Sequence, residues 1–138
     1  MAALPFSLRV RVYYEDTDAA GVVYYASYLR YLERARSEWL EAAGHSLADL
    51  ARVHGIAFVV RRLAIDYHAP ARLADRLDVT VEPQAAGRAS LEVAQRVRRD
   101  HETLATARVS LACVDGERFK PVRIPFSLTT GAPGKESD

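Results

Sequence analysis

This sequence has few cysteines, few lysines and no long apolar run. Cys113 is the single cysteine among 138 residues, which excludes a disulfide framework and a cluster of thiolate metal ligands. No purely aliphatic and aromatic stretch is longer than Ile56–Val60, which is far short of the roughly 18 residues of a membrane-spanning helix. The first residues have no basic start and no apolar stretch of signal-peptide length. We therefore expect a cytoplasmic protein with no membrane span.

An excess of charge of either sign is also lacking. The 19 basic and 18 acidic side chains leave a net charge of +1, so we expect no nucleic-acid partner. Apolar residues make up 49% and charged residues 27%, which is typical of a folded domain rather than a disordered chain. Arginine far outnumbers lysine. This excess suits phosphate binding, although a genome of biased base composition produces the same ratio.

The periodicity of apolar residues predicts one long helix between strands. Apolar and polar residues alternate over 8–14, which indicates a half-buried strand. One continuous stripe at helical spacing then follows, made of Tyr28, Leu32, Ala35, Trp39 and Ala42. Gly44 stands where a left-handed helix cap is expected, and a shorter helix is predicted over 47–54. Alternation returns in four later segments, 62–68, 77–82, 89–98 and 104–114.

The order strand, two helices, four strands favours an α+β fold, in which a five-stranded antiparallel sheet packs on the long helix. One helix cannot cover both faces and both edges of such a sheet, so we expect an oligomer that pairs edges or stacks faces. Tight connections are expected at Gly87 and around Asp100. Proline and glycine from Pro121 onward predict a fraying C-terminal end.

The segment Tyr14–Gly21 places three acids, Glu15, Asp16 and Asp18, within four residues. A calcium loop counted from Asp16 fails because its fifth and twelfth positions are Ala20 and Ser27. Phosphoryl transfer through an aspartyl intermediate fails because no supporting lysine or phosphate loop follows. A flexible, solvated turn, whose acids favour the positive end of the next helix, stays open.

A catalytic interpretation rests on the start of the long helix, expected near 24–26. The first N–H groups of a helix have no partner inside it. Donors of this kind next to Asp18 could bind an oxyanion while the carboxylate attacks a carbonyl or activates water. A thioester suits this arrangement, because a thiol with a pKa of about 8.5 leaves without a strong general acid.

The residues 9–28, RVRVYYEDTDAAGVVYYASY, resemble the signature of the YbgC-like acyl-CoA thioesterases. These proteins belong to the 4-hydroxybenzoyl-CoA thioesterase branch of the hotdog superfamily and are associated with the Tol–Pal system. Further matches lie at 33–36, 58–61 and 67–73, so that the resemblance extends over about 8–125.

The resemblance implies a single hotdog domain over 1–130, with a disordered tail over 131–138. It also implies a sheet wrapped around the long helix, and a homo-oligomer (a dimer or a tetramer built as a dimer of dimers) with active sites between protomers. The catalytic aspartate of the family matches Asp18, a family tyrosine matches Tyr14, and the backbone N–H that polarises the thioester falls at about Tyr25. Many relatives carry histidine at the position of Tyr25. No metal and no organic cofactor is implied.

Substrate contacts are expected at Gly21, Val59, Val60, Arg61 and Arg88. Coenzyme A carries several phosphate charges, so arginines should rim its site, although a solvated strand face is the default explanation for any one cluster. Two rivals to acyl-CoA hydrolysis stay open. One is a thioesterase that acts on acyl carrier protein, and the other is a non-catalytic scaffold linked to envelope or phospholipid synthesis.

The remaining reactive side chains favour structural roles. The four histidines are scattered without metal-ligand spacing, although His68 lies in a matching stretch. Cys113 is expected to be a small buried hydrophobe, and Ser27 lacks the flanking glycines of a nucleophile elbow. Tyrosines near the start of the helix could line an acyl pocket or pack in the core, with Tyr31 expected to be exposed.

Overall fold

The computed structural model describes residues 5–127, and the predicted tail 131–138 lies outside them. Their elements follow the order β1 (Phe6–Arg11), a 3₁₀ turn (Tyr14–Asp16), α1 (Ser27–Ala42), α2 (Leu47–Asp49) with a π-type extension (Leu50–His54), β2 (Ile56–Tyr67), β3 (Arg76–Ala86), β4 (Ser90–Arg99) and β5 (Glu102–Asp115). The strands form one sheet in the order β1-β3-β4-β5-β2, and every neighbouring pair is antiparallel.

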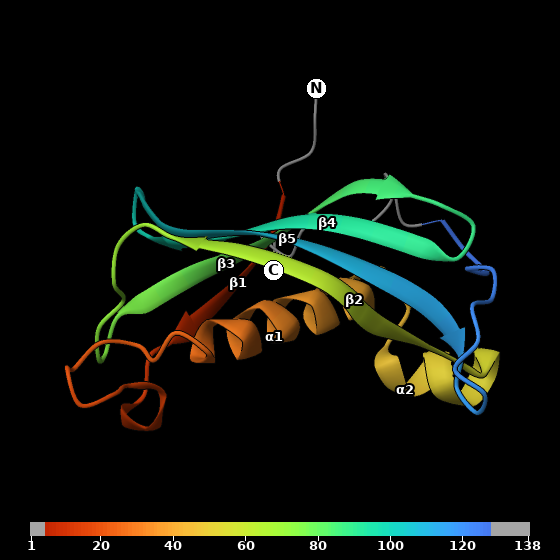
Figure 1. Ribbon diagram of the computed structural model, residues 1–138, viewed down its shortest axis with the longest axis horizontal. Helices are drawn as coiled ribbons and strands as arrows, with labels where there is room; N and C mark the ends of the chain where they lie inside the picture. Colours follow the sequence, from red (N-terminus) through yellow and green to blue (C-terminus); the bar gives the residue numbers. More distant parts are fainter. Residues whose placement is uncertain (1–4, 128–138) are drawn as a thin grey trace.

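The sheet curves over α1, which runs beneath it, and the turn before α1 lies at the opposite end of the helix from α2 (Figure 1). This arrangement confirms the predicted antiparallel sheet wrapped around one long helix. Within the described residues, no helix combines the length and apolar character that crossing a membrane requires.

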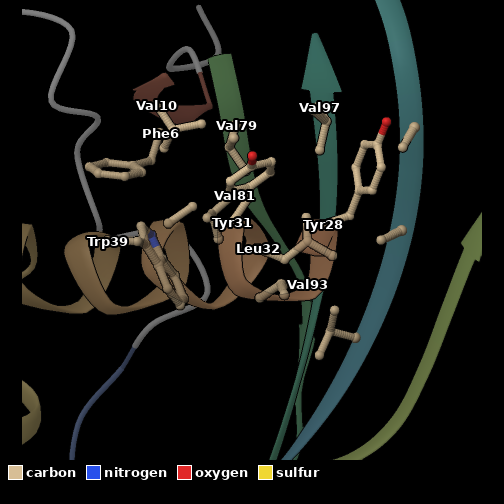
Figure 2. Packing of buried hydrophobic residues seen from close by; sticks show 14 of the residues in the cluster. Phe6, Val10, Tyr28, Tyr31, Leu32, Trp39, Val79, Val81, Val93 and Val97 are labelled. Atoms are coloured by element: carbon tan, nitrogen blue, oxygen red, sulfur yellow. The ribbon is translucent and has the colours of Figure 1, made fainter. Parts of the chain in front are cut away.

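The core lies between α1 and the concave face of the sheet. Figure 2 shows side chains of α1 packed against those of β3 and β4, among them Tyr28, Tyr31, Leu32, Trp39, Val79, Val81, Val93 and Val97. Burying each large apolar side chain contributes about 1.5–3 kcal/mol to folding. The predicted stripe is buried except for Ala42, which is half-buried. The expectation that Tyr31 is exposed is wrong, because the curved sheet covers more of α1 than one stripe and leaves Tyr31 0% exposed.

The predicted helix ends agree with the structure. Gly44 has φ +93°, which closes α1 as a left-handed cap, while its N–H donates to the Glu41 carbonyl. The Ser46 hydroxyl accepts the Asp49 N–H at 3.1 Å and so starts the predicted shorter helix.

Two strand boundaries differ from the prediction. The first strand ends at Arg11, and Tyr14 instead lies in the 3₁₀ turn, where its side chain is 81% exposed. The β2 strand begins at Ile56, well before the expected segment, because a bulge between Val60 and Arg62 joins the continuous apolar run 56–60 to the alternating run after it.

The segment 121–127 is not a fraying end. The Val122 N–H donates to the Cys113 carbonyl, and the Ile124 N–H donates to the Arg88 carbonyl. The Phe126 ring stacks on His45 with 3.7 Å between centroids. Apolar residues between the prolines fix this segment against the body of the fold, which proline and glycine content alone did not reveal.

Candidate active site at the start of α1

Asp16 anchors the acidic turn to α1. Its side chain is buried, and its Oδ2 accepts the Tyr13 N–H at 2.9 Å. Its Oδ1 accepts from Nη2 of Arg30 at 3.1 Å, an ion pair between the turn and the second turn of the helix. Both carboxylate oxygens are therefore engaged in holding the local fold, so that Asp16 is buried while Glu15 and Asp18 of the same turn are exposed.

The main chain of Asp16 holds the start of the helix as well. Its carbonyl accepts the Tyr24 N–H at 2.9 Å and the Ser27 hydroxyl at 3.2 Å. Arg30 also donates to the Ser27 hydroxyl at 3.1 Å. Sequence reasoning missed this network, although the spacing of Ser27 and Arg30 by three residues on one helix face was a usable signal.

The environment of Asp16 favours its ionised form. Burial raises the pKa of this carboxyl, but the Tyr13 N–H, the neighbouring Tyr31 hydroxyl and the Arg30 guanidinium together outweigh burial. The pKa of Asp16 consequently lies below its ordinary value, as expected of a carboxylate with a structural role.

Asp18, two residues later, has a different environment. Its side chain is exposed, and its Oδ1 accepts the Ala20 N–H at 2.8 Å. Main-chain bonds close the loop around it, from the Asp18 N–H to the Val22 carbonyl and from the Gly21 N–H to the Asp18 carbonyl. Gly21 adopts φ +81°, a conformation that glycine tolerates best. Within residues 5–127 the Oδ2 atom of Asp18 has no hydrogen-bond partner, so a fixed loop presents a free carboxylate oxygen.

A free backbone donor lies at the beginning of α1, which starts at Ser27, just after the predicted position. The Tyr24 carbonyl accepts the Ser27 N–H at 2.8 Å and so fixes the peptide that carries the Tyr25 N–H. That N–H forms no hydrogen bond with any described residue. The Tyr67 hydroxyl donates to the Tyr25 carbonyl at 2.9 Å and ties the same point to β2. The peptide is thus held in place while its N–H stays available.

Exposed aromatic side chains occur in the same turn and at the start of α1. Tyr14, Tyr25 and Tyr24 are 81%, 63% and 46% exposed, and the rings of Tyr24 and Tyr25 are 4.8 Å apart. The neighbouring Tyr25 hydroxyl raises the pKa of the Tyr24 phenol, and burial and the charge of Asp18 add to this effect. Asp18 is therefore within electrostatic range of this tyrosine pair. A cluster of exposed aromatic residues is typical of a surface that a ligand or partner covers.

The model of the thioesterase-like superfamily matches residues 12–130, which include the turn, α1 and all strands after β1. The chain belongs to this superfamily. The acyl-CoA thioesterase YbgC of Haemophilus influenzae is 47% identical over 120 residues, which cover 87% of this chain and 88% of that protein.

Solved structures of thioesterase-like proteins share the fold. A probable thioesterase from Bartonella henselae superimposes with a TM-score of 0.85 at 35% identity, covering 88% of this chain and all of that one. A 1,4-dihydroxy-2-naphthoyl-CoA thioesterase from Synechocystis gives a TM-score of 0.80 at 28% identity, covering 88% of this chain and 90% of that one. These likenesses support the hotdog architecture inferred from the sequence.

In this thioesterase-like chain, the predicted site residues fall into two groups. Tyr14, Asp18, Gly21 and Tyr25 lie together around the turn and the start of α1. Val59–Arg61 lie on β2, six to eight residues or about 20–26 Å of strand from Tyr67, which contacts Tyr25. One chain therefore does not bring the two groups together.

The two predicted phosphate-binding arginines are also apart. Arg61 lines a pocket of about 300 Å³ together with Arg62 and Glu92. Arg88 lines a separate, more open pocket with Arg123. A single chain of this thioesterase-like protein thus offers two arginine pairs rather than one rim.

The reactive side chains outside the turn have structural environments. Cys113 is buried, which raises the pKa of its thiol and confirms the prediction of a small buried side chain. Nε2 of His68 lies 3.1 Å from the Thr106 hydroxyl on β5. Among residues 5–127, no three histidine, cysteine or acidic side chains are placed to hold a metal ion.

Proposed function

We propose that this protein hydrolyses acyl-CoA thioesters to a free acid and coenzyme A, with Asp18 as base or nucleophile. The observation that supports this most directly is that the turn leaves one Asp18 oxygen free and the start of α1 leaves the Tyr25 N–H without a partner among the described residues. Both groups are held by main-chain hydrogen bonds, so no reorganisation is needed when charge develops in the transition state. The names of the relatives, which are acyl-CoA thioesterases, supply the substrate class.

The reaction divides between these two groups. The Tyr25 N–H donates to the thioester carbonyl oxygen and stabilises the negative charge that develops there. Asp18 either removes a proton from an attacking water or attacks the carbonyl carbon itself, forming an anhydride that water then hydrolyses. In both cases the C–S bond breaks, the thiolate leaves, and the acid is released. Tyr14, 81% exposed beside the turn, is proposed to contact the acyl group.

Tyrosine at position 25, where many relatives have histidine, leaves oxyanion binding intact because the donor is a main-chain N–H. The Tyr25 side chain packs edge-on against Tyr67, with 6.5 Å between ring centroids. We propose that this aromatic wall, rather than an imidazole, contacts the acyl group.

We further propose that two copies of the chain complete the site by pairing their β2 strands. The 12-residue β2 lies at the edge of the sheet, and within the described residues no strand covers its outer side. A long unpaired edge is a template for another strand. Antiparallel pairing across a two-fold axis would bring Val59–Arg61 of one copy towards the Tyr67 end of the other and unite the two groups of site residues.

Replacing Asp18 by asparagine tests the catalytic assignment. The Asp18→Asn variant keeps an oxygen that can accept the Ala20 N–H, but it loses the charge. We expect kcat to fall by about 10²–10⁴-fold with an unchanged melting temperature. The measurement is release of free thiol from a panel of acyl-CoA substrates.

Glu15→Gln is the matched control, because Glu15 is an exposed acid in the same turn. It should keep the wild-type kcat. Full turnover by Asp18→Asn would refute the assignment. Turnover of carrier-protein thioesters alone, in a comparison with matched acyl-CoA substrates, would move the substrate to a protein carrier.

Replacing Val60 by aspartate tests the β2 pairing. Val60 is 48% exposed on β2, so a charge there should separate the copies without disturbing the core. We expect sedimentation to show a dimer for wild type and a monomer with little turnover for Val60→Asp. The control is Val53→Asp, at a valine that is 62% exposed and lies outside β2, in the helical turn before it. A monomeric Val60→Asp variant with full turnover would show that one chain suffices.

A further inference from the structure

The loop that joins β2 to β3, residues 68–75, supports both ends of the acidic turn. Before the turn, the Val12 N–H donates to the Asp75 carbonyl at 2.9 Å. After the turn, the Val23 N–H donates to the Ala71 carbonyl at 2.8 Å. The chain therefore enters and leaves the acidic turn along this one loop, although the loop lies about 50 residues further along the sequence.

The same loop also supports the start of α1. The Ala71 N–H donates to the Tyr28 hydroxyl at 3.1 Å, in the first turn of the helix. Tyr67, the residue just before the loop, donates its hydroxyl to the Tyr25 carbonyl. The 68–75 loop consequently connects the support of Asp18 with the support of the Tyr25 N–H.

Arg99, the last residue of β4, holds this loop from the opposite side. Its Nη1 donates to Oδ2 of Asp75 at 2.7 Å and to the Pro70 carbonyl at 3.3 Å, while its Nη2 donates to Oε1 of Glu102 at 2.8 Å. The side chains of Arg99 and Asp75 are 28% and 22% exposed, so salt screens this ion pair less than a surface pair. Figure 1 shows the acidic turn, the 68–75 loop and the β4–β5 connection at the same end of the molecule.

The backbone of the loop is strained where Asp75 fixes it. Ala74 has φ +72°, in the left-handed region that is unfavourable for a residue with a Cβ. Such a conformation persists only where surrounding contacts enforce it, and strain of this kind clusters at functional sites. Here Oδ2 of Asp75 accepts the Arg72 N–H at 2.8 Å, and the Asp75 N–H donates to the Arg72 carbonyl at 3.0 Å. The shape of the loop thus depends on the carboxylate that Arg99 holds.

We propose that Arg99 and Asp75 are positioning residues for thioester hydrolysis, a role that rests on the proposed function. Through the 68–75 loop they fix the distance between the Asp18 carboxylate and the Tyr25 N–H. Neither side chain needs to touch the substrate. A displacement of about 1 Å can cost about 100-fold in rate, so the ion pair matters more for turnover than for substrate binding.

Arg99→Met removes all three hydrogen bonds of the guanidinium and keeps an unbranched side chain. We expect kcat for acyl-CoA to fall by about 10–100-fold while KM stays within about twofold of wild type. The control is Arg96→Met, which should keep the wild-type kcat. Arg96 is exposed on the same strand, and its side chain has no hydrogen bond or ion pair with any residue of 5–127. A raised KM with unchanged kcat in Arg99→Met would make Arg99 a substrate contact and overturn the proposal.

A double-mutant cycle separates positioning from a general loss of folded protein. If Arg99 acts through Asp18, Arg99→Met should lower the residual turnover of Asp18→Asn by no more than about twofold. A loss of folded protein would instead lower turnover by the same factor in both backgrounds. That equal loss would show that Arg99 has only a structural role.

Amide hydrogen exchange tests the support of the turn without measuring turnover. We expect the Val12 and Val23 N–H groups to exchange at least about tenfold faster in Arg99→Met, while amides in the middle of β4 and β5 keep their wild-type rates. Unchanged exchange at both valines, or unchanged kcat, would refute the positioning role in a protein that still hydrolyses acyl-CoA. A wild-type protein without acyl-CoA turnover would instead refute the proposed function, and this role with it.

Discussion

Asp16 and Asp18 are two residues apart in one turn, yet the fold uses them in opposite ways. Asp16 is 3% exposed, and its two carboxylate oxygens accept hydrogen bonds from Tyr13 and Arg30. Asp18 is exposed, and one of its carboxylate oxygens accepts a hydrogen bond from the Ala20 N–H of its own loop. The comparison teaches that a carboxylate with both oxygens hydrogen-bonded within the protein holds a site together. A carboxylate with one free oxygen can instead interact with a substrate or water.

The same substitution at the two positions should separate these roles most strongly. In Asp18→Asn the large loss is expected in kcat, as set out above. In Asp16→Asn the new amide group turns a donor towards Arg30 or the Tyr13 N–H, which are donors themselves. We expect urea unfolding to show about 1–3 kcal/mol less stability, without a comparable fall in kcat per folded molecule. Equal stability of Asp16→Asn and wild type would contradict the structural role.

Low pH should also reveal the structural role of Asp16, through its effect on stability. Because the pKa of Asp16 is lower in the folded than in the unfolded chain, the folded state binds its proton less readily. The stabilisation is therefore complete above the unfolded pKa of about 3.9 and is lost as pH falls through the folded pKa. Urea unfolding at stepped pH below about 5 should show a steeper loss for wild type than for Asp16→Asn. If the free energy of unfolding fell with pH equally steeply in wild type and Asp16→Asn, a contribution of Asp16 to the acid sensitivity would be ruled out.

A smaller effect is expected at the glycines. Gly21, in the loop around Asp18, and Gly44, at the end of α1, both have positive φ, and an added Cβ would meet no atom within 4 Å at either position. Alanine therefore costs only backbone strain, about 1 kcal/mol at each position. Gly21→Ala should in addition lower kcat because it shifts Asp18, whereas Gly44→Ala should not. Equal kcat values in the two variants would show that the loop tolerates the strain.

The parts of this protein that the sequence predicted depend on local periodicity. The alternation of apolar and polar residues in 77–82 and 89–98 is typical of strands with one buried face. The structure places those segments in β3 and β4. Gly44 marked the end of α1 because few other residues adopt its φ. The motif around Asp18 directed attention to this turn through its resemblance to a family.

What the sequence did not show depends on contacts between distant segments. Tyr31 lies at the edge of the apolar stripe of α1, and its burial is seen only once the helix is packed against the sheet. Arg99 resembles any surface arginine until Asp75, 24 residues away, is placed against it. The free N–H of Tyr25 is visible only once Tyr67 and Ser27 fix the surrounding peptides.

The amino-acid order by itself determined the strands, the long helix and the turn that carries the acids, because each of these depends on neighbours within a few residues. Tertiary structure alone decided which acid is buried and which stays free. It also decided that an arginine at the end of β4 holds the loop that supports the turn. The physical reason is that burial and the occupancy of hydrogen-bond acceptors are set by residues far away along the chain, which only folding brings together.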